Sequence, residues 1–325
     1  MGSPCYSAHR MKILRHIIII ALAGILLAAQ TAYARTVDWR VTRAEHFIIY
    51  YASRHEQIAG RAKSIAEKSY AHLSRKLGFA PGGIIPIYLY PDRISFSEAE
   101  GIDSTDSIVG TAQTRTLRIK IDASGTFADI KGVIPHELVH VFIFRKLHGN
   151  STTLPMWMHE GLAKYFAEDW TGADAELLAD AASGGGVLPL TEITDSFPAD
   201  KRKRSIAYVQ SYSAVKHMVD RYGPETVTNL LTEIEHYRSF RTAMLYSVGL
   251  YPDKFEEDWR QYLWEEYGLS RWLRFASAVL SAAMAIFAIL AFRARRIRKR
   301  QKEEEFEAED FDEDVEDLGT ERLGD

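Results

Sequence analysis

The motif HELVH at residues 136–140 constrains the fold more than any other part of this 325-residue chain. It lies inside an apolar stretch that starts at Val133 and continues through Phe144. Residues four apart share one face of a helix, so both imidazoles point the same way. Burying two imidazoles and a carboxylate costs several kcal/mol unless a partner compensates. The stretch therefore predicts a core helix with a divalent cation bound between its two histidines.

The residue types in this motif point to hydrolysis. Two neutral imidazoles at this spacing bind one Zn²⁺ through nitrogens at ~2.0–2.1 Å. Glu137 lies one step round the helix, where it reaches a water on the ion but is not placed to be a ligand. A metal-dependent hydrolase needs a Lewis acid with a base beside its water. We therefore predict His136 and His140 as ligands and Glu137 as the base.

A third ligand is expected on the next helix, because zinc hydrolases have three protein ligands and one open position. Glu160 follows His140 by twenty residues and lies near the start of a second amphipathic stretch. A turn at 149–150 allows the two helices to run antiparallel, so that Glu160 faces the imidazoles. The alternatives are His159, which is expected to point ~100° away from Glu160 around the helix, and His148, at the other end of the first helix.

The remaining pattern predicts an α+β fold, in which a small mixed sheet in the N-terminal half is followed by a helical half. Strands are expected in the apolar segments at 46–52, 85–90 and 108–112, and a half-exposed strand is expected in the alternating segment 117–122. A helix is expected from the capping box Ser53-x-x-Glu56 to the closing Gly78. Helical periodicity starts near Asp129 and is interrupted by loops at 184–186 and 195–203.

HELVH followed by WMHEGLAKYF at 157–166 resembles the gluzincin metallopeptidases, the thermolysin-like group. The closest match is the bacterial peptidase MA-like domain. The resemblance covers roughly residues 44–265, including the stretch 110–112 before the motif helix and the segment 207–212. It implies a zincin-like fold.

This resemblance also implies a site. It implies zinc on His136, His140 and Glu160, and Glu137 as the base on the zinc-bound water and then as the proton shuttle to the leaving amine. It implies an edge strand near 108–113 that pairs with the substrate backbone. Such sites place a Tyr or His beside the tetrahedral intermediate.

Three residues are candidates for this oxyanion-stabilising role: Tyr208, Tyr212 and His217. We favour Tyr208 as the second catalytic residue. The two tyrosines are four residues apart, so packing together as core aromatics is the alternative.

The chain departs from the family pattern around the motif. Pro135 directly precedes the first histidine, so the helix begins there or bends there. Lys164 occupies the position at which thermolysin-like enzymes have an Asp that orients an imidazole. The orienting group must then come from elsewhere, and Glu168 and Asp169 are considered for it.

Two related classes fit less well. A metzincin needs Gly and His where this chain has Ile143 and Lys146. The amine-anchoring motif Gly-x-Met-Glu-Asn of related aminopeptidases is absent upstream, which favours endopeptidase action.

Two terminal apolar runs predict export and anchoring. Residues 1–34 have the layout of a signal peptide, with Met11 as the expected initiator, an apolar core at 17–29 and a small-x-small cleavage signal at 32–34. Residues 271–293 are expected to form a transmembrane helix, because the uncharged stretch 275–292 extends for about 27 Å, near the thickness of the hydrocarbon core. The basic residues after it place the C-terminus in the cytoplasm.

The protein is therefore expected to be a single-pass protein of a bacterial cell membrane, with a metallopeptidase domain at 35–270 on the extracytoplasmic, periplasmic side. The tail at 294–325 is basic and then acidic, and we expect it to be disordered and cytoplasmic. The single cysteine, Cys5, lies in the signal region, so the exported part has no thiol.

We expect this domain to be a zinc-dependent peptidase whose partners are a peptide or protein substrate and the membrane. A nucleic-acid partner is not expected, because the net charge is −4 and the basic cluster at 201–204 has no interleaved aromatic residues. The alternative is a zinc-binding module, catalytically weak or inactive, that serves as an anchored scaffold or binds peptides.

Overall fold

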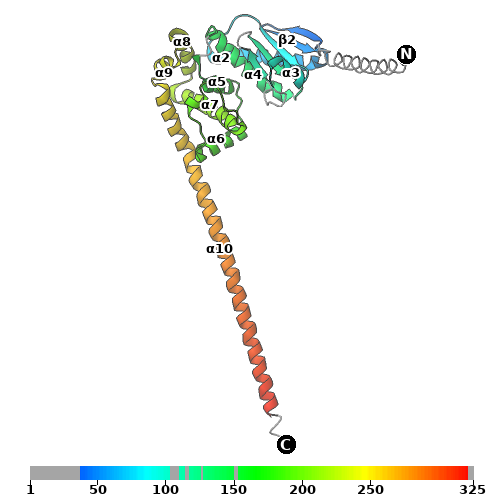
Figure 1. Cartoon of the computed structure of the whole chain (residues 1–325), viewed down its shortest axis with the longest axis vertical. Coiled ribbons are helices and arrows are strands. Elements are labelled where there is room, and N and C mark those ends of the chain that lie inside the picture. Colours follow the sequence, from blue (N-terminus) through cyan, green and yellow to red (C-terminus); the bar gives the residue numbers. More distant parts are fainter. Residues whose placement is uncertain (1–36, 103–109, 114–116, 126, 150–152, 321–325) are drawn as a thin grey trace, which may run out of the picture.

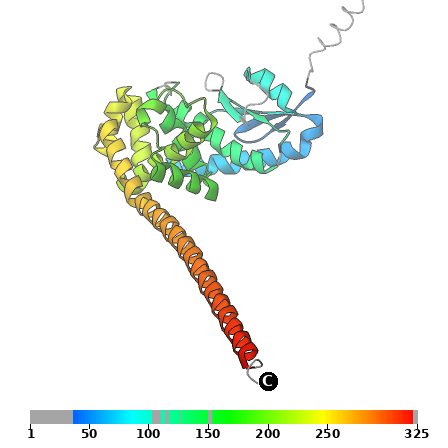
Figure 2. The same cartoon turned by 60° about the horizontal axis from the view of Figure 1, so that its bottom comes forward.

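The computed structural model describes residues 37–102, 110–113, 117–125, 127–149 and 153–320. The predicted signal peptide at 1–34, with Cys5, lies outside the described residues. Two halves lie side by side, one built on a sheet and one from helices, and a long helix leaves the helical half (Figures 1 and 2). This is the α+β order that the sequence predicts.

The sheet has five strands in the order β1-β2-β3-β5-β4. They are β1 (Trp39–Arg43), β2 (Phe47–Ala52), β3 (Ile85–Tyr90), β4 (Gly110–Gln113) and β5 (Arg118–Asp122). Strands β2, β3 and β5 are parallel, and β1 and β4 pair antiparallel at the two edges. The strand predicted at 108–112 corresponds to β4, although residues 108 and 109 lie outside the described residues.

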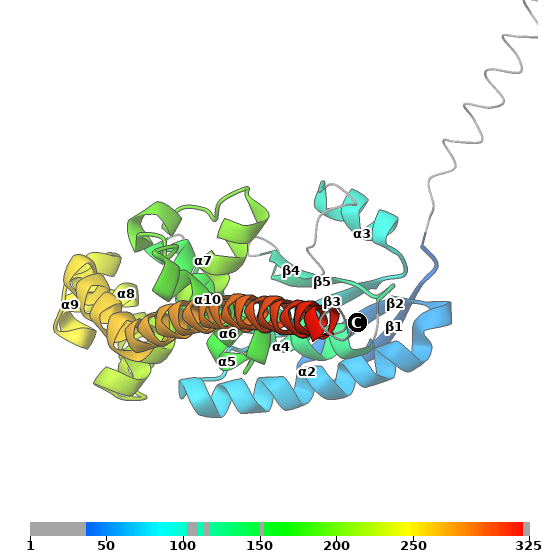
Figure 3. The same ribbon diagram turned by 90° about the horizontal axis from the view of Figure 1, so that it is seen from below.

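Helices cover both faces of the sheet. Helices α2 (Glu56–Leu77) and α4 (Phe127–Lys146) pack together on one face, and α3 (Arg93–Glu100) lies on the other (Figure 3). In β2 and β3 buried apolar side chains alternate with half-buried ones, so one face of these strands is the core face. Each Å² of apolar surface that these side chains bury stabilises the fold by roughly 25 cal/mol.

Two local predictions in this half are wrong. The predicted capping box does not form, because Ser53–His55 is a 3-10 turn and α2 begins at Glu56 without a side-chain cap. Strand β5 is not half-exposed: Lys120 and Asp122 are both buried. Lys120 is paired with Glu100 at 2.7 Å, which satisfies its charge in the covered sheet.

The helical half contains α5 (Met156–Phe166), α6 (Gly172–Gly184), a 3-10 turn η3 (Leu190–Ile193), α7 (Lys201–Tyr222), α8 (Thr226–Tyr237), α9 (Phe240–Val248) and α10 (Pro252–Thr320). The loop predicted at 184–186 is confirmed by the left-handed Gly185. The loop predicted at 195–203 ends earlier, because Asp200 caps α7 by accepting a hydrogen bond from the backbone N–H of Lys203.

Helix α10 continues through most of the C-terminal tail, whereas the sequence predicts disorder from 294. Lys299 and Arg300 precede Glu303 and Glu304 by four positions, and opposite charges at this spacing favour a helix. Within the side chains that the structure describes, no helix combines the length and the apolarity needed to cross a membrane. The predicted transmembrane segment 271–293 includes residues 271–275 and 278, whose side chains lie outside that set.

Candidate metal centre

Two neighbouring helices bring the three predicted ligands together. Helix α4 carries His136 and His140, and α5 carries Glu160. Glu160 Oε2 lies 3.3 Å from His136 Nε2, and Glu160 Oε1 lies 3.8 Å from His140 Nε2. One ligand atom from each residue lies within 4.8 Å of the other two. Two imidazole nitrogens and one carboxylate oxygen at this separation fit a zinc ion.

Helix α4 passes through Pro135 without ending. The sequence predicts that the helix starts or bends at this proline. The first alternative is wrong, because α4 starts eight residues earlier, at Phe127. A proline inside a helix removes one backbone hydrogen bond, so the helix is weakened directly before the first ligand, His136. The buried side chains of Ile134, Leu138 and Phe142 hold this part of α4 in the core.

Glycine at position 161 lets α5 approach α7 closely. A Cβ atom on Gly161 would lie 2.4 Å from the backbone oxygen of Ser211 and 2.8 Å from Cγ2 of Val215. Real Cβ atoms do not come this close to a backbone atom, so only glycine fits without a shift of one helix. The contact fixes the position of the neighbouring Glu160 along α7.

The edge strand β4 lies directly against Glu137. A Cβ atom on Gly110 would lie 2.3 Å from Val133 Cγ1 and 3.2 Å from Glu137 Oε1. The Glu137 carboxylate also accepts a hydrogen bond from the backbone N–H of Ala112. The small residues of β4 therefore let the strand pass close to the carboxylate, in the position predicted for a substrate-pairing strand.

Burial and nearby charges separate the pKa values of the site residues. Burial raises the pKa of the Glu137 carboxyl to about 7, with a further contribution from Glu160. Burial lowers the pKa of His140 to about 3. Burial on its own would raise the pKa of Glu160, but His140 and the hydrogen bond with His136 bring it down to about 2. At neutral pH Glu160 is thus ionised and His140 neutral, the forms in which they bind metals.

The raised pKa of Glu137 predicts a pH effect on the metal-free protein. Between pH 4.5 and about 7 the folded state holds a proton on Glu137 that the unfolded state has released, so stability falls as the pH rises. Glu137→Gln removes this dependence, which amounts to at most about 3 kcal/mol. Urea unfolding with a chelator at pH 5 and pH 8 measures it. Equal losses of stability in both proteins would contradict the assignment.

The three candidate oxyanion donors have different surroundings. Tyr208 lines the same cleft as the metal site, a cavity of about 580 Å³, and its ring packs edge-on against Phe197. Burial, with the negative charges of Glu160 and Glu137, raises the pKa of the Tyr208 phenol, so it keeps its proton. Tyr212 instead stacks on Trp170. His217 is held by Asp258 at 2.8 Å. Only Tyr208 of the three lines the cleft.

The structure separates the remaining predicted residues. His148 Nε2 contacts Glu235 at 3.0 Å, away from the site. Glu168 pairs with His72, and Asp169 pairs with Lys164, so neither provides a hydrogen bond to a ligand imidazole among the described contacts. Lys164 also contacts Asp174 and so ties α5 to the start of α6.

His159 is the residue whose position the sequence reasoning missed. It is not one of the three converging ligands, as predicted, but its ring does not point away from them: its Nδ1 lies 2.9 Å from Nδ1 of His140. Helical phase gave the direction of its Cα–Cβ bond, whereas the long imidazole reaches back to the neighbouring helix. An imidazole directly before a predicted ligand is the signal that could have identified it.

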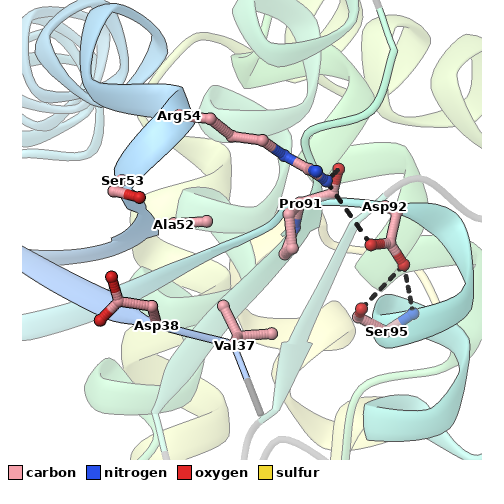
Figure 4. Close-up of a pocket in the computed structure, with 8 residues that line it drawn as sticks. All are labelled: Val37, Asp38, Ala52, Ser53, Arg54, Pro91, Asp92 and Ser95. Carbon is pink, nitrogen blue, oxygen red and sulfur yellow. Dashed lines mark hydrogen bonds and ion pairs between the residues drawn. The ribbon is translucent and has the colours of Figure 1, made fainter. Parts of the chain in front are cut away.

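A second cavity lies at the carboxyl ends of β2 and β3, around Arg54 and Asp92 (Figure 4). Asp92 accepts hydrogen bonds from the backbone and hydroxyl of Ser95, and Arg54 donates to the carbonyl of Pro91. These hydrogen bonds pair the polar groups with one another, at the point where β3 ends and α3 begins. Among the residues described there, no set of metal-binding groups converges.

A mixed sheet whose edge strand runs past a His-Glu-x-x-His helix, with a carboxylate supplied by the next helix, defines the zinc-metallopeptidase class of site. The chain belongs to the Peptidase MA superfamily, whose family model matches residues 65–265. This range contains α4, α5 and α7, and hence all three converging ligands.

Individual relatives are distant. The uncharacterized protein YhcO of Bacillus subtilis (strain 168) is 20% identical over 226 residues, which are 66% of this chain and 68% of the relative. Among solved structures, the M1 zinc metallopeptidase from Deinococcus radiodurans is similar with a TM-score of 0.40 and 14% identity, over 70% of this chain and 51% of that chain. A mutant of the same protein is similar with a TM-score of 0.40 and 16% identity, over 70% of this chain and 52% of that chain. The chain spans about half the length of these structures.

Proposed function

We propose that the protein is a zinc-dependent peptidase that cleaves within polypeptide chains. The observation that carries the proposal is the convergence of His136, His140 and Glu160 beside the buried carboxylate of Glu137, in a cleft bordered by an edge strand. Membership of the Peptidase MA superfamily supports it. Zinc is the cation that best suits two imidazoles and one carboxylate.

In this proposal His136, His140 and Glu160 would hold the ion, which when bound would supply a Lewis acid for the scissile carbonyl and the attacking water. Glu137 accepts the proton of that water on its carboxylate and later delivers it to the nitrogen of the leaving amine. In the metal-free protein burial raises the pKa of this carboxyl to about 7. A nearby cation would lower it, so the carboxylate is the form available to accept a proton near neutral pH. The phenol O–H of Tyr208 donates a hydrogen bond to the carbonyl oxygen as negative charge develops there.

The substrate backbone lies along β4 in this proposal. Strand β4 is at the end of the sheet, with β5 as its only strand partner among the described residues. Its outer edge, at Gly110 and Ala112, borders the cleft. An extended peptide can add to such an edge through backbone hydrogen bonds. Recognition through the backbone supports cleavage inside a chain, where no terminal amine or carboxylate is needed.

The full chain, purified in detergent and loaded with zinc, should hydrolyse members of an unbiased peptide library. A chelator should abolish the hydrolysis, and added zinc should restore it. Peptides blocked at both ends should be cleaved as well as free peptides if the activity is that of an endopeptidase. Zinc-dependent peptide binding without turnover of any library member would instead favour the scaffold alternative.

We further propose that α10 anchors the domain in a bacterial cell membrane, with the catalytic domain periplasmic and the C-terminus cytoplasmic. Two features support this: the uncharged sequence 275–292 with basic residues directly after it, and the exposure of its described apolar side chains. Phe287, for example, is 74% exposed. A large apolar surface along one helix calls for a lipid or protein environment.

A reporter enzyme fused after Asp325 tests the orientation. Alkaline phosphatase, which requires export, should be inactive there, whereas a cytoplasmic reporter should be active. The membrane fraction should retain the fusion after a salt wash. Active phosphatase at Asp325 would reverse the proposed orientation, and release by salt would contradict the anchor.

A further inference from the structure

The imidazole of His159 contacts Nδ1 of His140, one of the three proposed metal ligands. The Nδ1 atoms of His140 and His159 are 2.9 Å apart, and the ring centroids are 5.1 Å apart. This is the only hydrogen bond described for the His140 side chain, apart from its approach to Glu160 through Nε2. His159 thereby fixes the ring of His140 about its χ2 axis.

A cation bound to Nε2 of His140 would also determine where the protons of the two rings lie. His140 directs Nε2 towards Glu160 and the ligand cluster, so a cation bound there requires Nε2 to be free of its proton. The neutral ring then carries its proton on Nδ1 and donates it to Nδ1 of His159. His159 must accept on Nδ1, and its own proton is consequently on Nε2.

The Nε2 atom of His159 is available to a ligand. No partner for it occurs among the described residues, and it is not one of their enclosed, unpartnered side-chain atoms. His159 lines the cleft that contains the metal site, between Met156 and Glu160 on α5. With its proton on Nε2, His159 is a hydrogen-bond donor among the residues that line the cleft.

Resting on the proposed function, we propose that His159 has two linked roles. It positions His140 for metal binding by accepting its Nδ1–H, and it presents an Nε2–H donor to a carbonyl oxygen of the bound peptide. An asparagine could also accept from His140, but a histidine transmits the tautomer of one ring to the next. The chemistry of the recognised group is thus a backbone or side-chain carbonyl oxygen.

The first role is tested by the zinc affinity of the full chain, measured by competition with a chromophoric chelator. His159→Ala should weaken zinc binding about 10- to 100-fold, the usual effect of losing a group that orients a ligand. His159→Asn should bind zinc nearly as tightly as wild type, because Oδ1 of Asn occupies the position of Nδ1. His72→Asn, at a histidine paired with Glu168 outside the cleft, is the matched control and should change nothing.

The second role is tested by His159→Asp, which accepts from His140 but has no donor. With zinc saturating, its kcat/KM on a peptide should be about tenfold below that of His159→Asn, as for the loss of one hydrogen bond. Unchanged zinc affinity in His159→Ala would overturn the positioning role, and equal kcat/KM in the Asp and Asn variants would overturn the donor role. Absence of zinc binding in the wild type would instead refute the proposed function itself.

Discussion

Replacing Glu137 by Gln is expected to lower peptide hydrolysis by about 10²- to 10⁴-fold, the usual contribution of a positioned acid–base group. The amide has nearly the shape of the carboxylate but cannot accept a proton from water. Glu137 is not one of the three converging ligands, so zinc content should remain at the wild-type level. Steady-state kinetics on a peptide substrate, together with metal analysis of the same sample, measures both quantities.

Glu176→Gln is a useful control, because Glu176 lies in α6 and is not part of the cleft. It should leave both the rate and the zinc content unchanged. Full activity in Glu137→Gln would contradict the assignment of the base. A loss of zinc along with the activity would show that the residue acts on the metal rather than on the water.

Gly161→Ala is expected to destabilise the fold and to disturb the metal site. The added methyl group would lie 2.4 Å from the Ser211 backbone oxygen, and α5 would have to move away from α7. Overpacking of this kind costs about 1–3 kcal/mol, which exceeds the up to ~1 kcal/mol gained from replacing glycine in a helix. Because Glu160 is the adjacent residue, zinc affinity should fall with stability. Urea unfolding and chelator competition measure the two effects.

Gly60→Ala provides the matched comparison. Gly60 also lies inside a helix, α2, but a Cβ atom there has no neighbour within 4 Å. This change should stabilise the protein by up to ~1 kcal/mol. If both substitutions stabilise equally, the close approach of α5 to α7 is not a packing constraint.

The sequence was sufficient for the elements with strong periodicity and for the motif residues. The predicted helix that ends at Gly78 and the strand at 85–90 are confirmed, because apolar spacing and a left-handed glycine specify them locally. The meeting of Glu160 with the two imidazoles was predicted from loop length and helical phase. Those rules apply because α4 and α5 are adjacent in the chain.

Features that depend on tertiary contacts were not predictable in this way. Lys120 occupies an alternating strand and reads as exposed, but α3 covers that face of the sheet and supplies Glu100. The sequence suggests Glu168 or Asp169 as the group that orients an imidazole, whereas the described contact to His140 comes from His159. Side-chain reach between two helices is not encoded in the spacing along either helix.

The central claim, that His136, His140 and Glu160 bind one zinc ion, is tested most directly by metal analysis of the purified full chain. We predict one zinc per chain in the wild type, and a loss of tightly bound zinc in Glu160→Ala, which removes the ligand from the second helix. Retention of zinc with unchanged affinity in Glu160→Ala, or a wild-type protein that takes up no zinc, would contradict the account.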